Sequence, residues 1–377
     1  MKKSRFKRLF KHFKRIIVLV IVVVLFVFLP MVKMGEDDNY QLVLDSFVGA
    51  KSKYQGVFEI WNIDTFEGGK ISKTVALSNF AKDFQRKNKG AYIIVRNVSE
   101  TECENLLKMG QVPDLFSCSY GVAEIIKPYL QAFSNGEFGL PNNFTEAGKN
   151  EKGELMGVAW CMNNYFLIST PEYLTKSKVE IDDSFRLSDR IFEMGYDVAL
   201  KNSTKTIYSC LFGSGKYQMP LKALESYNNI KVSSISEKAL NRDAGKTSSY
   251  SAYCDFIAGK GVVLIGNYRD VIRMENRKSL GKVEDVVVEQ VLNFSDMVQF
   301  LFLTKTDDVD KRECEEKFVK FVTESVCQKQ LCENGILPVN LDDKQGVMKH
   351  IVLDKIKDYS LLNVFVSKKE IEEMRQY

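Results

Sequence analysis

The chain has 377 residues, which is enough for two domains of ordinary size, and 45% of them are hydrophobic. Its formal charge of +4 is unevenly placed: residues 1–15 hold eight Lys or Arg and no acid, which leaves 45 basic against 49 acidic residues elsewhere. A slightly acidic body argues against nucleic-acid binding, and the two histidines, His12 and His350, are too few for the common zinc sites.

The N-terminal segment is typical of a membrane anchor. Fourteen uninterrupted apolar residues run from Ile16 to Leu29, and residues 30–32 extend the run to seventeen. This length lies between that of a signal-peptide core and that of a short membrane span. No pair of small residues marks a cleavage site after the run, and the first cysteine, Cys103, comes too late in the chain for lipid attachment.

We therefore expect a cytoplasmic basic segment at residues 1–15, a transmembrane anchor (or uncleaved signal) at residues 16–32 and a tether at residues 33–55. The bulk of the chain would then be extracellular, held at the cell membrane by a single span. Every later block of ten residues contains a charged or polar residue, so we expect no second span.

The eight cysteines predict free thiols rather than disulfides or a metal site. None belongs to a C-x-x-C pair. Cys327 and Cys332 are five residues apart on an expected helix, a spacing that suits a disulfide poorly. We interpret the cysteines as small buried hydrophobic residues, which suits an exterior that is not strongly oxidising.

The first predicted strand leads into the first candidate for ligand contact. A β-prone run at residues 57–63 changes abruptly into the polar, glycine-bearing loop 64–69. Apolar residues at helical spacing then follow between Val75 and Phe84. In open α/β sheets, ligands bind beyond the carboxyl ends of the strands, so the loop is placed to touch a ligand. The alternative is a surface turn that binds nothing.

The next elements continue the strand-then-helix order. A strand is predicted at residues 91–98, and Ser99 with Glu102 forms a capping box for a helix that Gly110 ends. A short strand near residue 116 precedes a helical pattern at residues 122–130, which Pro128 should kink. This order predicts a parallel sheet covered by helices.

The second half of the chain is predicted in less detail. Residues 155–170 are strand-like but interrupted by Asn163-Asn164, as expected where a chain leaves one domain for another. We predict helices near residues 185–200 and 218–227 and one long helix from Asp310 to Glu333, with Asn334-Gly335 as its C-cap. Further strands are expected at residues 261–265, 286–292 and 298–303.

No enzyme or cofactor signature is complete. Ala244-Gly245-Lys246-Thr247 resembles the end of a phosphate-binding P-loop, but Leu240 stands where the first glycine belongs. Gly213-Ser214-Gly215 lacks the third glycine of a dinucleotide fingerprint and a strand before it. No histidine accompanies a cysteine as a catalytic base. We expect no catalytic residues, no metal and no cofactor.

Five short motifs follow one another in the chain. They are the opening strand with Trp61, the helix ending at Phe80-x-x-x-Phe84, the run Gly110 to Leu115, the crossover Gly157-Val158-Ala159-Trp160, and Gln330-Leu331 followed by Gly335-Ile336-Leu337-Pro338-Val339. Together they resemble extracellular solute-binding proteins of ABC importers, of the carbohydrate-type, maltose-binding-protein-like class. The resemblance covers roughly residues 55–345.

The resemblance implies a type II periplasmic-binding-protein-like fold, in which two α/β lobes close on a small solute by a hinge motion. Lobe 1 would comprise residues 56–160 and about 286–325, and lobe 2 residues 161–285 and about 326–377. The expected partners are a small-molecule solute and the permease subunits of an ABC transporter, and a monomer is expected. The residues expected to line the cleft are Asp64, Thr65, Phe66, Glu67, Ser119, Tyr120, Trp160, Asn163, Asn164, Tyr165, Asn267, Tyr268 and Arg269.

These side chains suit a sugar, because aromatic faces stack on sugar rings while carboxylates, amides and Arg satisfy hydroxyls. Two departures from the family pattern matter: the lipid-attachment cysteine is missing, and only two tryptophans are present. The alternative function is a membrane-tethered solute sensor or an envelope interaction module on the same scaffold, not coupled to transport.

Overall fold

The computed structural model describes residues 50–66, 68–134, 136–176, 249–259, 263–290, 294–340 and 359–375. The chain divides into two compact units. One comprises residues 1–52 and 86–89, and the other comprises residues 53–85 and 90–377. The expected anchor at residues 16–32 and the expected helices near residues 185–200 and 218–227 lie outside the described residues. Within those residues, no helix combines the length and the apolar character that a membrane span requires.

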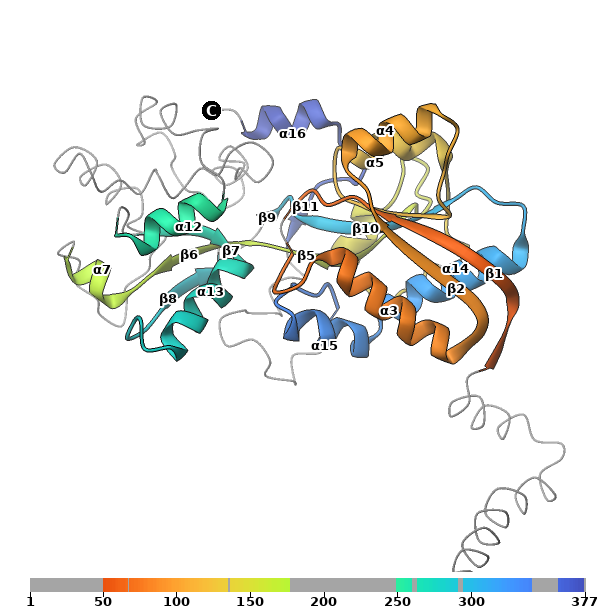
Figure 1. Ribbon diagram of the computed structural model, residues 1–377. Coiled ribbons are helices and arrows are strands. Elements are labelled where there is room, and N and C mark those ends of the chain that lie inside the picture. The colour runs from red at the N-terminus through yellow and green to blue at the C-terminus, as the bar shows by residue number, and fades with distance from the viewer. Residues whose placement is uncertain are drawn as a thin grey trace, which may run out of the picture. The chain divides into compact units, whose positions relative to one another are not determined.

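The larger of the two main sheets has six strands in the order β2-β1-β3-β10-β4, with β5 also paired to β10 (Figure 1). Strand β1 runs parallel to β3, with Trp61 beside Phe116. Strand β10 runs antiparallel to β3, β4 and β5. The strands are β1 (Ala50–Asn62), β2 (Asn88–Asn97), β3 (Leu115–Cys118), β4 (Leu130–Gln131), β5 (Gly157–Met162) and β10 (Val298–Thr304).

The sequence predicted a parallel sheet, but the larger sheet is mixed. The prediction was wrong for β10, which is antiparallel to its neighbours. A strand–helix–strand crossover fixes neighbouring strands as parallel, which is the case for β1 and β3. Strand β10 instead returns to the sheet after the chain has passed through the smaller sheet, so no such crossover sets its direction.

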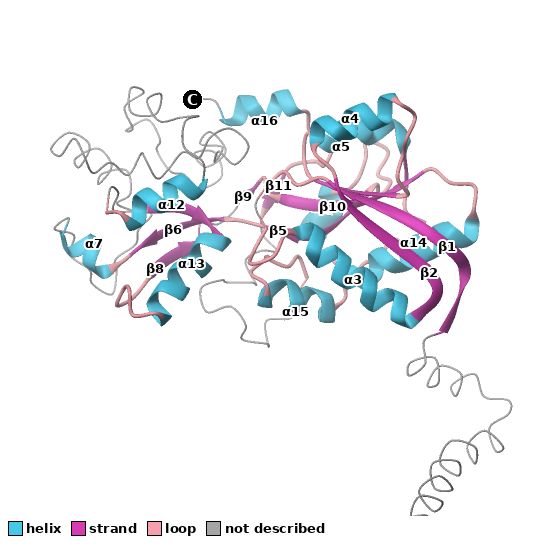
Figure 2. Cartoon of the chain, in the orientation of Figure 1, coloured by secondary structure: helices cyan, strands magenta, loops and turns pink. Residues whose placement is uncertain are grey.

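Helices cover both faces of the larger sheet (Figure 2). On one face, Phe58 of β1 packs edge-on against Phe318, which also contacts Phe84. On the other, Trp61 and Phe116 share a core with Leu106. The covering helices are α3 (Lys73–Lys87) and α14 (Val309–Thr323) on the first face, and α4 (Glu100–Lys108) and α5 (Val122–Ile126) on the second.

The predicted caps fix where these helices begin and end. The Ser99 side chain accepts a hydrogen bond of 3.1 Å from the Glu102 N–H, which confirms the N-cap half of the predicted capping box, while the Glu102 carboxylate accepts from Arg96. Gly110 follows the end of α4 with φ of +76°, a value that favours glycine. After α5, the 3₁₀ turn η1 (Lys127–Tyr129) contains Pro128, which confirms the predicted irregularity. Helix α6 (Asn142–Ala147) follows before β5.

The smaller sheet has three antiparallel strands in the order β7-β6-β8. The chain passes into it from β5 through Asn163-Asn164, where the predicted strand interruption is confirmed. Its elements are β6 (Tyr165–Ser169), β7 (Leu264–Asn267), β8 (Val287–Gln290), α7 (Pro171–Lys176), α12 (Ser249–Ile257) and α13 (Tyr268–Ser279).

The predicted single helix from Asp310 to Glu333 is two helices, α14 and α15 (Ser325–Glu333). Glu324 between them is extended, with φ of −67° and ψ of 150°. The break is stabilised by Gln328, whose side-chain amide donates to the carbonyls of Val322 and Trp160 and therefore replaces a helical hydrogen bond. The predicted C-cap is confirmed: Asn334 ends α15 and Gly335 has φ of +73°.

The C-terminal segment packs on the larger sheet's helices and on the crossing segment. Strand β11 (Ser360–Leu361) pairs in parallel with β9 (Phe294–Ser295). Helix α16 (Lys368–Arg375) lies beside α4, since Lys368 Nζ is 2.7 Å from a carboxylate oxygen of Glu100. The exact boundaries of the two lobes remain predictions. In the structure, β8 belongs to the smaller sheet, and α15 contacts β5 of the larger sheet.

The free thiols expected from the sequence are confirmed for the seven cysteines that the structure describes, of which six are buried and Cys254 is partly exposed. Burial raises the pKa of the Cys103 thiol to about 11, so this thiol is not a reactive nucleophile.

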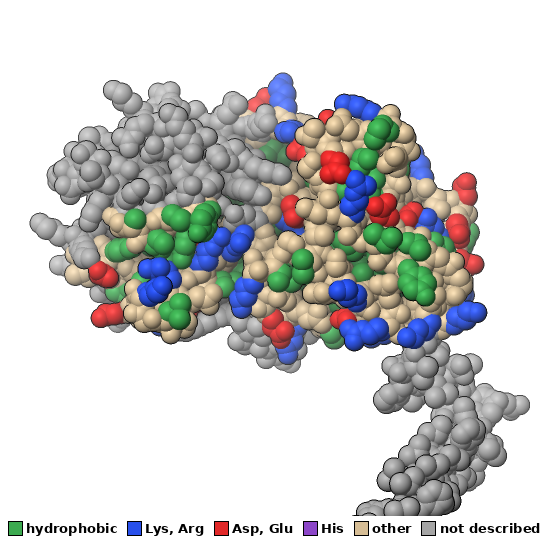
Figure 3. Space-filling view, in the orientation of Figure 1, with side chains coloured by type: hydrophobic (Ala, Val, Ile, Leu, Met, Phe, Trp, Pro, Cys, Tyr) green, Lys and Arg blue, Asp and Glu red, His purple; other side chains and the backbone are tan. Residues whose placement is uncertain are grey.

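Acidic and basic side chains both occur across the face drawn in Figure 3.

Candidate functional site

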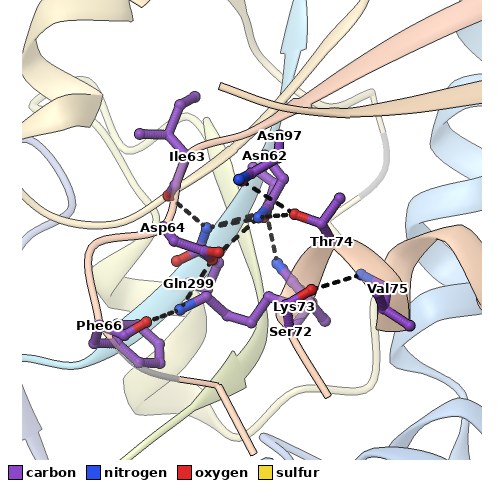
Figure 4. A network of polar contacts seen from close by, with 12 residues as sticks. Asn62, Ile63, Asp64, Phe66, Ser72, Lys73, Thr74, Val75, Asn97 and Gln299 are labelled. Carbon is purple, nitrogen blue, oxygen red and sulfur yellow. Dashed lines mark hydrogen bonds and ion pairs between the residues drawn. The ribbon is translucent and has the colours of Figure 1, made fainter. Parts of the chain in front are cut away.

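A buried polar network joins the ends of the central strands of the larger sheet. Asn62 ends β1, and its side-chain oxygen accepts a hydrogen bond of 2.8 Å from the Ser117 hydroxyl on β3. The Gln299 amide nitrogen on β10 lies 3.3 Å from the same oxygen and 3.1 Å from the Ile63 carbonyl (Figure 4). These buried groups hydrogen-bond to one another, which fixes the three strands where the first loop leaves the sheet.

Lys73 organises the loop that follows β1. Its side chain is completely buried, and its ammonium donates a hydrogen bond of 2.5 Å to the Phe66 carbonyl. The same ammonium lies 3.3 Å from an Asp64 carboxylate oxygen and 3.5 Å from the centre of the Phe66 ring. Figure 4 shows the side chain reaching from the start of α3 into the loop. The loop is therefore held in a defined shape by a buried cation rather than left as an open turn.

Three polar side-chain atoms near this sheet edge are shielded from solvent and have no hydrogen-bond partner among the residues that the structure describes: Thr65 Oγ1, the Tyr120 hydroxyl and Gln299 Oε1. Thr65 follows β1, Tyr120 follows β3, and Gln299 begins β10 beside the end of β3. Because a buried polar atom without a partner costs about 1–3 kcal/mol, such atoms gathered at one edge favour an external group as their partner.

The crossing segment between the two main sheets is tied down through Asn163. Its side-chain oxygen accepts from the Asn164 N–H at 2.9 Å and from the Tyr268 N–H at 3.0 Å. Its backbone N–H donates to the Met297 carbonyl, and its carbonyl accepts from the Ser295 hydroxyl. Asn163 therefore connects both sheet-to-sheet passages with the start of α13.

Two tyrosines predicted to line the cleft are linked by Asp296, which sequence reasoning missed. The Tyr165 hydroxyl donates a hydrogen bond of 2.7 Å to the Asp296 carboxylate. Burial and the nearby negative charge of Asp296 both raise the pKa of Tyr120 well above its usual value. Ser119 is buried beside Tyr120, and its carbonyl accepts from the Ala123 N–H in the first turn of α5.

Asn164 is buried, and its amide donates a hydrogen bond of 2.6 Å to the Tyr359 hydroxyl. Gln290 of β8 donates to the same hydroxyl. Tyr359 therefore joins the two passages between the sheets, and burial raises the pKa of its hydroxyl. This arrangement makes Asn164 a structural residue of the crossing.

The expected contacts at residues 267–269 lie at a helix start instead of beyond a parallel strand. Strand β7 is antiparallel to β6, so the rule for parallel strand ends does not apply there. Asn267 is the N-cap of α13 and accepts from the Arg269 N–H at 2.9 Å, while Tyr268 packs its ring on Phe166. Arg269 stands in the first helical turn with a partly exposed side chain.

Trp160 does not offer a stacking face in this structure. The ring is fully buried, contacts Phe80 edge-on, and donates from its Nε1 to the Ser117 hydroxyl at 3.2 Å. The ring belongs to a buried cluster with residues of α3 and α15, so we do not carry Trp160 into the proposed site. Glu67 lies outside the described residues.

Some residues of the site could have been found from their setting in the sequence. Gln299 interrupts the apolar strand run V-Q-F-L-F-L, and Asn62 interrupts W-N-I. A polar residue inside such a run indicates a buried hydrogen-bonding role. Lys73, Asp296 and Tyr359 carry no comparable signal, because each is an ordinary residue in a polar stretch of the sequence.

The structure is similar to solved solute-binding proteins. The GacH receptor of Streptomyces glaucescens, solved unliganded and with acarbose, matches with a TM-score of 0.62 and 14% identity, over 86% of this chain and 92% of that protein. The sugar-binding protein MalE of Xanthomonas citri matches with a TM-score of 0.58 and 14% identity, over 85% and 90%. An ABC substrate-binding protein of Listeria monocytogenes, solved with cycloalternan, matches with a TM-score of 0.54 and 13% identity, over 85% and 90%.

No family model matches the sequence, and no curated protein matches it. At identities of 13–14%, the structural likeness establishes the fold. The chain has the two-lobed α/β fold of maltose-binding-protein-like substrate-binding proteins, which confirms the fold expected from the sequence motifs.

Proposed function

We propose that this chain captures a small solute, a sugar or an oligosaccharide, and presents it to an ABC importer. The observation that carries the proposal lies at one edge of the larger sheet: buried polar atoms of Thr65, Tyr120 and Gln299 have no partner within the described part of the chain. Hydroxyl and amide groups of this kind pair with sugar hydroxyls. The sugar complexes of proteins with the same fold support this class of solute.

The site that we propose has two parts. The first part holds Asp64, Thr65 and Phe66, with Ser119 and Tyr120 after β3. The second part holds Asn163 and Tyr165 at the crossing and Asn267, Tyr268 and Arg269 at the start of α13. Lys73 supports the first part by fixing the loop, and Gln299 fixes the strand ends through its amide nitrogen while its oxygen is offered to the solute. No catalytic step belongs to this function.

Delivery to an importer requires the protein to work outside the membrane. We propose that residues 16–32 anchor the chain, with the basic residues 1–15 in the cytoplasm and the lobes extracellular. The partners are then the permease subunits of an ABC transporter. The proposed solute-binding form is a monomer.

A thermal-shift screen of the full-length chain in detergent micelles tests the proposal. The ligand panel contains maltose-series, chitin-series and galactose-series oligosaccharides, with peptides and amino acids as the non-sugar arm. A ligand at 100 times its Kd adds about 2.7 kcal/mol to the unfolding free energy, which gives a clear rise in Tm. No shift with any sugar, together with a shift in the non-sugar arm, would overturn the sugar proposal.

A further inference from the structure

Three segments far apart in the sequence meet at two glycines. Gly69 lies in the loop after β1, Gly335 follows α15, and Ile272 lies on α13. A Cβ atom on Gly335 would stand 2.1 Å from the Cδ1 of Ile272, and Gly69 Cα would be 3.7 Å from that Cβ. The Lys70 N–H donates a hydrogen bond of 2.7 Å to the Asn334 carbonyl. The loop after β1 and the end of α15 thus form one continuous backbone surface, and the Ile272 side chain packs on it.

Gly335 has two roles that no other residue could combine. Its φ of +73° ends α15, with the Gly335 N–H bonded to Cys332 and the Ile336 N–H bonded to Leu331. Its missing Cβ also leaves the space that the Ile272 side chain fills. Gly69 is under a similar constraint, because a Cβ there would stand 2.1 Å from the Asn334 carbonyl oxygen.

A second contact lies on the same face of α13. Tyr268 precedes Ile272 by four residues, which places both on one side of the helix. Tyr268 shares a buried apolar cluster with Cys332 of α15, and burial, with a smaller effect of Cys332, raises the pKa of the Tyr268 hydroxyl. Tyr268, Ile272 and Cys332 belong to, or pack against, one apolar cluster.

This contact joins the two parts of the proposed site. Helix α13 follows β7 of the smaller sheet, whereas Gly69 and α15 pack with the larger sheet. Other links in the described part of the chain include the passages at residues 163–164 and 294–297, together with Tyr359. We propose that Ile272, seated on Gly69 and Gly335, is a latch that holds the two lobes together in this arrangement and thereby sets the affinity for the solute without touching it. The affinity part rests on the proposed function.

The direction of the effect follows from the position of Gly69. The loop that carries Gly69 also carries Asp64, Thr65 and Phe66, which belong to the first part of the proposed site. Release of α13 from this loop therefore parts the two groups of contacts and frees the solute. Trimming Ile272 favours the separated arrangement, raises the solute Kd and speeds dissociation.

The test compares Ile272→Ala with Leu280→Ala, a control at the other end of the same helix with a side chain 69% exposed. Hydrogen–deuterium exchange is measured on the ligand-free, full-length chain in detergent micelles. We expect roughly five- to tenfold faster exchange at residues 268–275 and 332–337 in Ile272→Ala, from the loss of a few partly buried carbons. Ile272→Val should restore most of the protection, and Leu280→Ala should match the wild type.

Unchanged exchange at both segments in Ile272→Ala would overturn the latch. Faster exchange spread evenly over both sheets with a lower Tm would also overturn it, because that pattern reports general loss of packing. This measurement needs no solute, so it remains decisive if the sugar screen fails. With a sugar from the screen, Kd should rise about five- to tenfold in Ile272→Ala, and an unchanged Kd would refute the link to affinity.

Discussion

The ammonium of Lys73 lies 3.3 Å from a carboxylate oxygen of Asp64, although the Lys73 side chain is completely buried and Asp64 is 30% exposed. The pair joins the first residue of α3 to the loop that follows β1. A buried ammonium needs its donors satisfied, and the Phe66 carbonyl and ring contact it as well. The loop conformation and the start of α3 are therefore mutually dependent.

Replacing Lys73 with Met should destabilise the protein by about 1–3 kcal/mol, because the Phe66 carbonyl loses its donor inside the protein. The similar volume of Met keeps the packing of α3 nearly unchanged. Urea unfolding measures the effect, with Lys82→Met on the exposed side of the same helix as control. Equal stability of the two variants would show that the buried ammonium does not hold the loop.

Tyr120→Phe should weaken solute binding by about 0.5–1.5 kcal/mol while leaving the ligand-free stability unchanged, because no described residue hydrogen-bonds to the hydroxyl. Calorimetric titration and unfolding on the same variant give the two values. A loss of stability without a loss of affinity would place the hydroxyl outside the site.

The contrasting variant is Ser117→Ala. In the wild type, the Ser117 hydroxyl donates to Asn62 and accepts from Trp160. It should lower stability by about 1–3 kcal/mol, because it leaves buried polar groups unpaired. The comparison distinguishes the Tyr120 hydroxyl, which we expect to bind the solute, from the Ser117 hydroxyl, which is hydrogen-bonded within the fold.

The fold was predictable where local signals agree with one another. The cap at Ser99, the stop at Gly110, the interruption at Asn163-Asn164 and the end at Gly335 all lie where the sequence places them. Each rests on the backbone chemistry of a few neighbouring residues, which tertiary contacts do not alter.

Features that depend on distant partners were not predictable. The direction of β10 is set by the passage of the chain through the smaller sheet. The break at Glu324 depends on Gln328, whose amide reaches the Trp160 carbonyl across 168 residues of sequence. Asp296 and Tyr359 likewise gain their roles from partners that are distant in the sequence, 131 residues away for Asp296 and 69 and 195 for Tyr359.

Arg269 stays a predicted contact, now from the first turn of α13. The carboxylate of the neighbouring Asp270 forms an ion pair of 2.6 Å with Arg273 and accepts a hydrogen bond from the Asn267 N–H. Arg269→Ala should cost about 1.5–3 kcal/mol of solute affinity, the range for hydrogen bonds to a charged group. Arg269→Lys should not fully restore binding, since an ammonium lacks the guanidinium fork. An unchanged Kd in both variants removes Arg269 from the site.

A buried carboxyl group on α14 gives the protein a pH-dependent stability. Glu315 is 1% exposed, and neither of its carboxylate oxygens has a hydrogen-bond partner in the part of the chain that the structure describes. Burial and the negative charge of Asp114 raise its pKa from 4.5 to about 8, against the opposing effect of Lys311. The charges of Asp308 and Glu316 act in the same direction as Asp114.

The native state therefore keeps the Glu315 proton between about pH 4.5 and pH 8, whereas the unfolded chain releases it. Since the native state binds more protons in this window, the contribution of Glu315 to stability is complete below pH 4.5 and is lost as the pH rises to about 8. Glu315→Gln resembles the protonated acid and should gain about 2–3 kcal/mol over the wild type near pH 8, with little difference at pH 4.5. Urea unfolding at several pH values measures this difference, with the exposed Asp310→Asn on the same helix as control. A gain that is constant across the pH range would mean that Glu315 does not change protonation in this window.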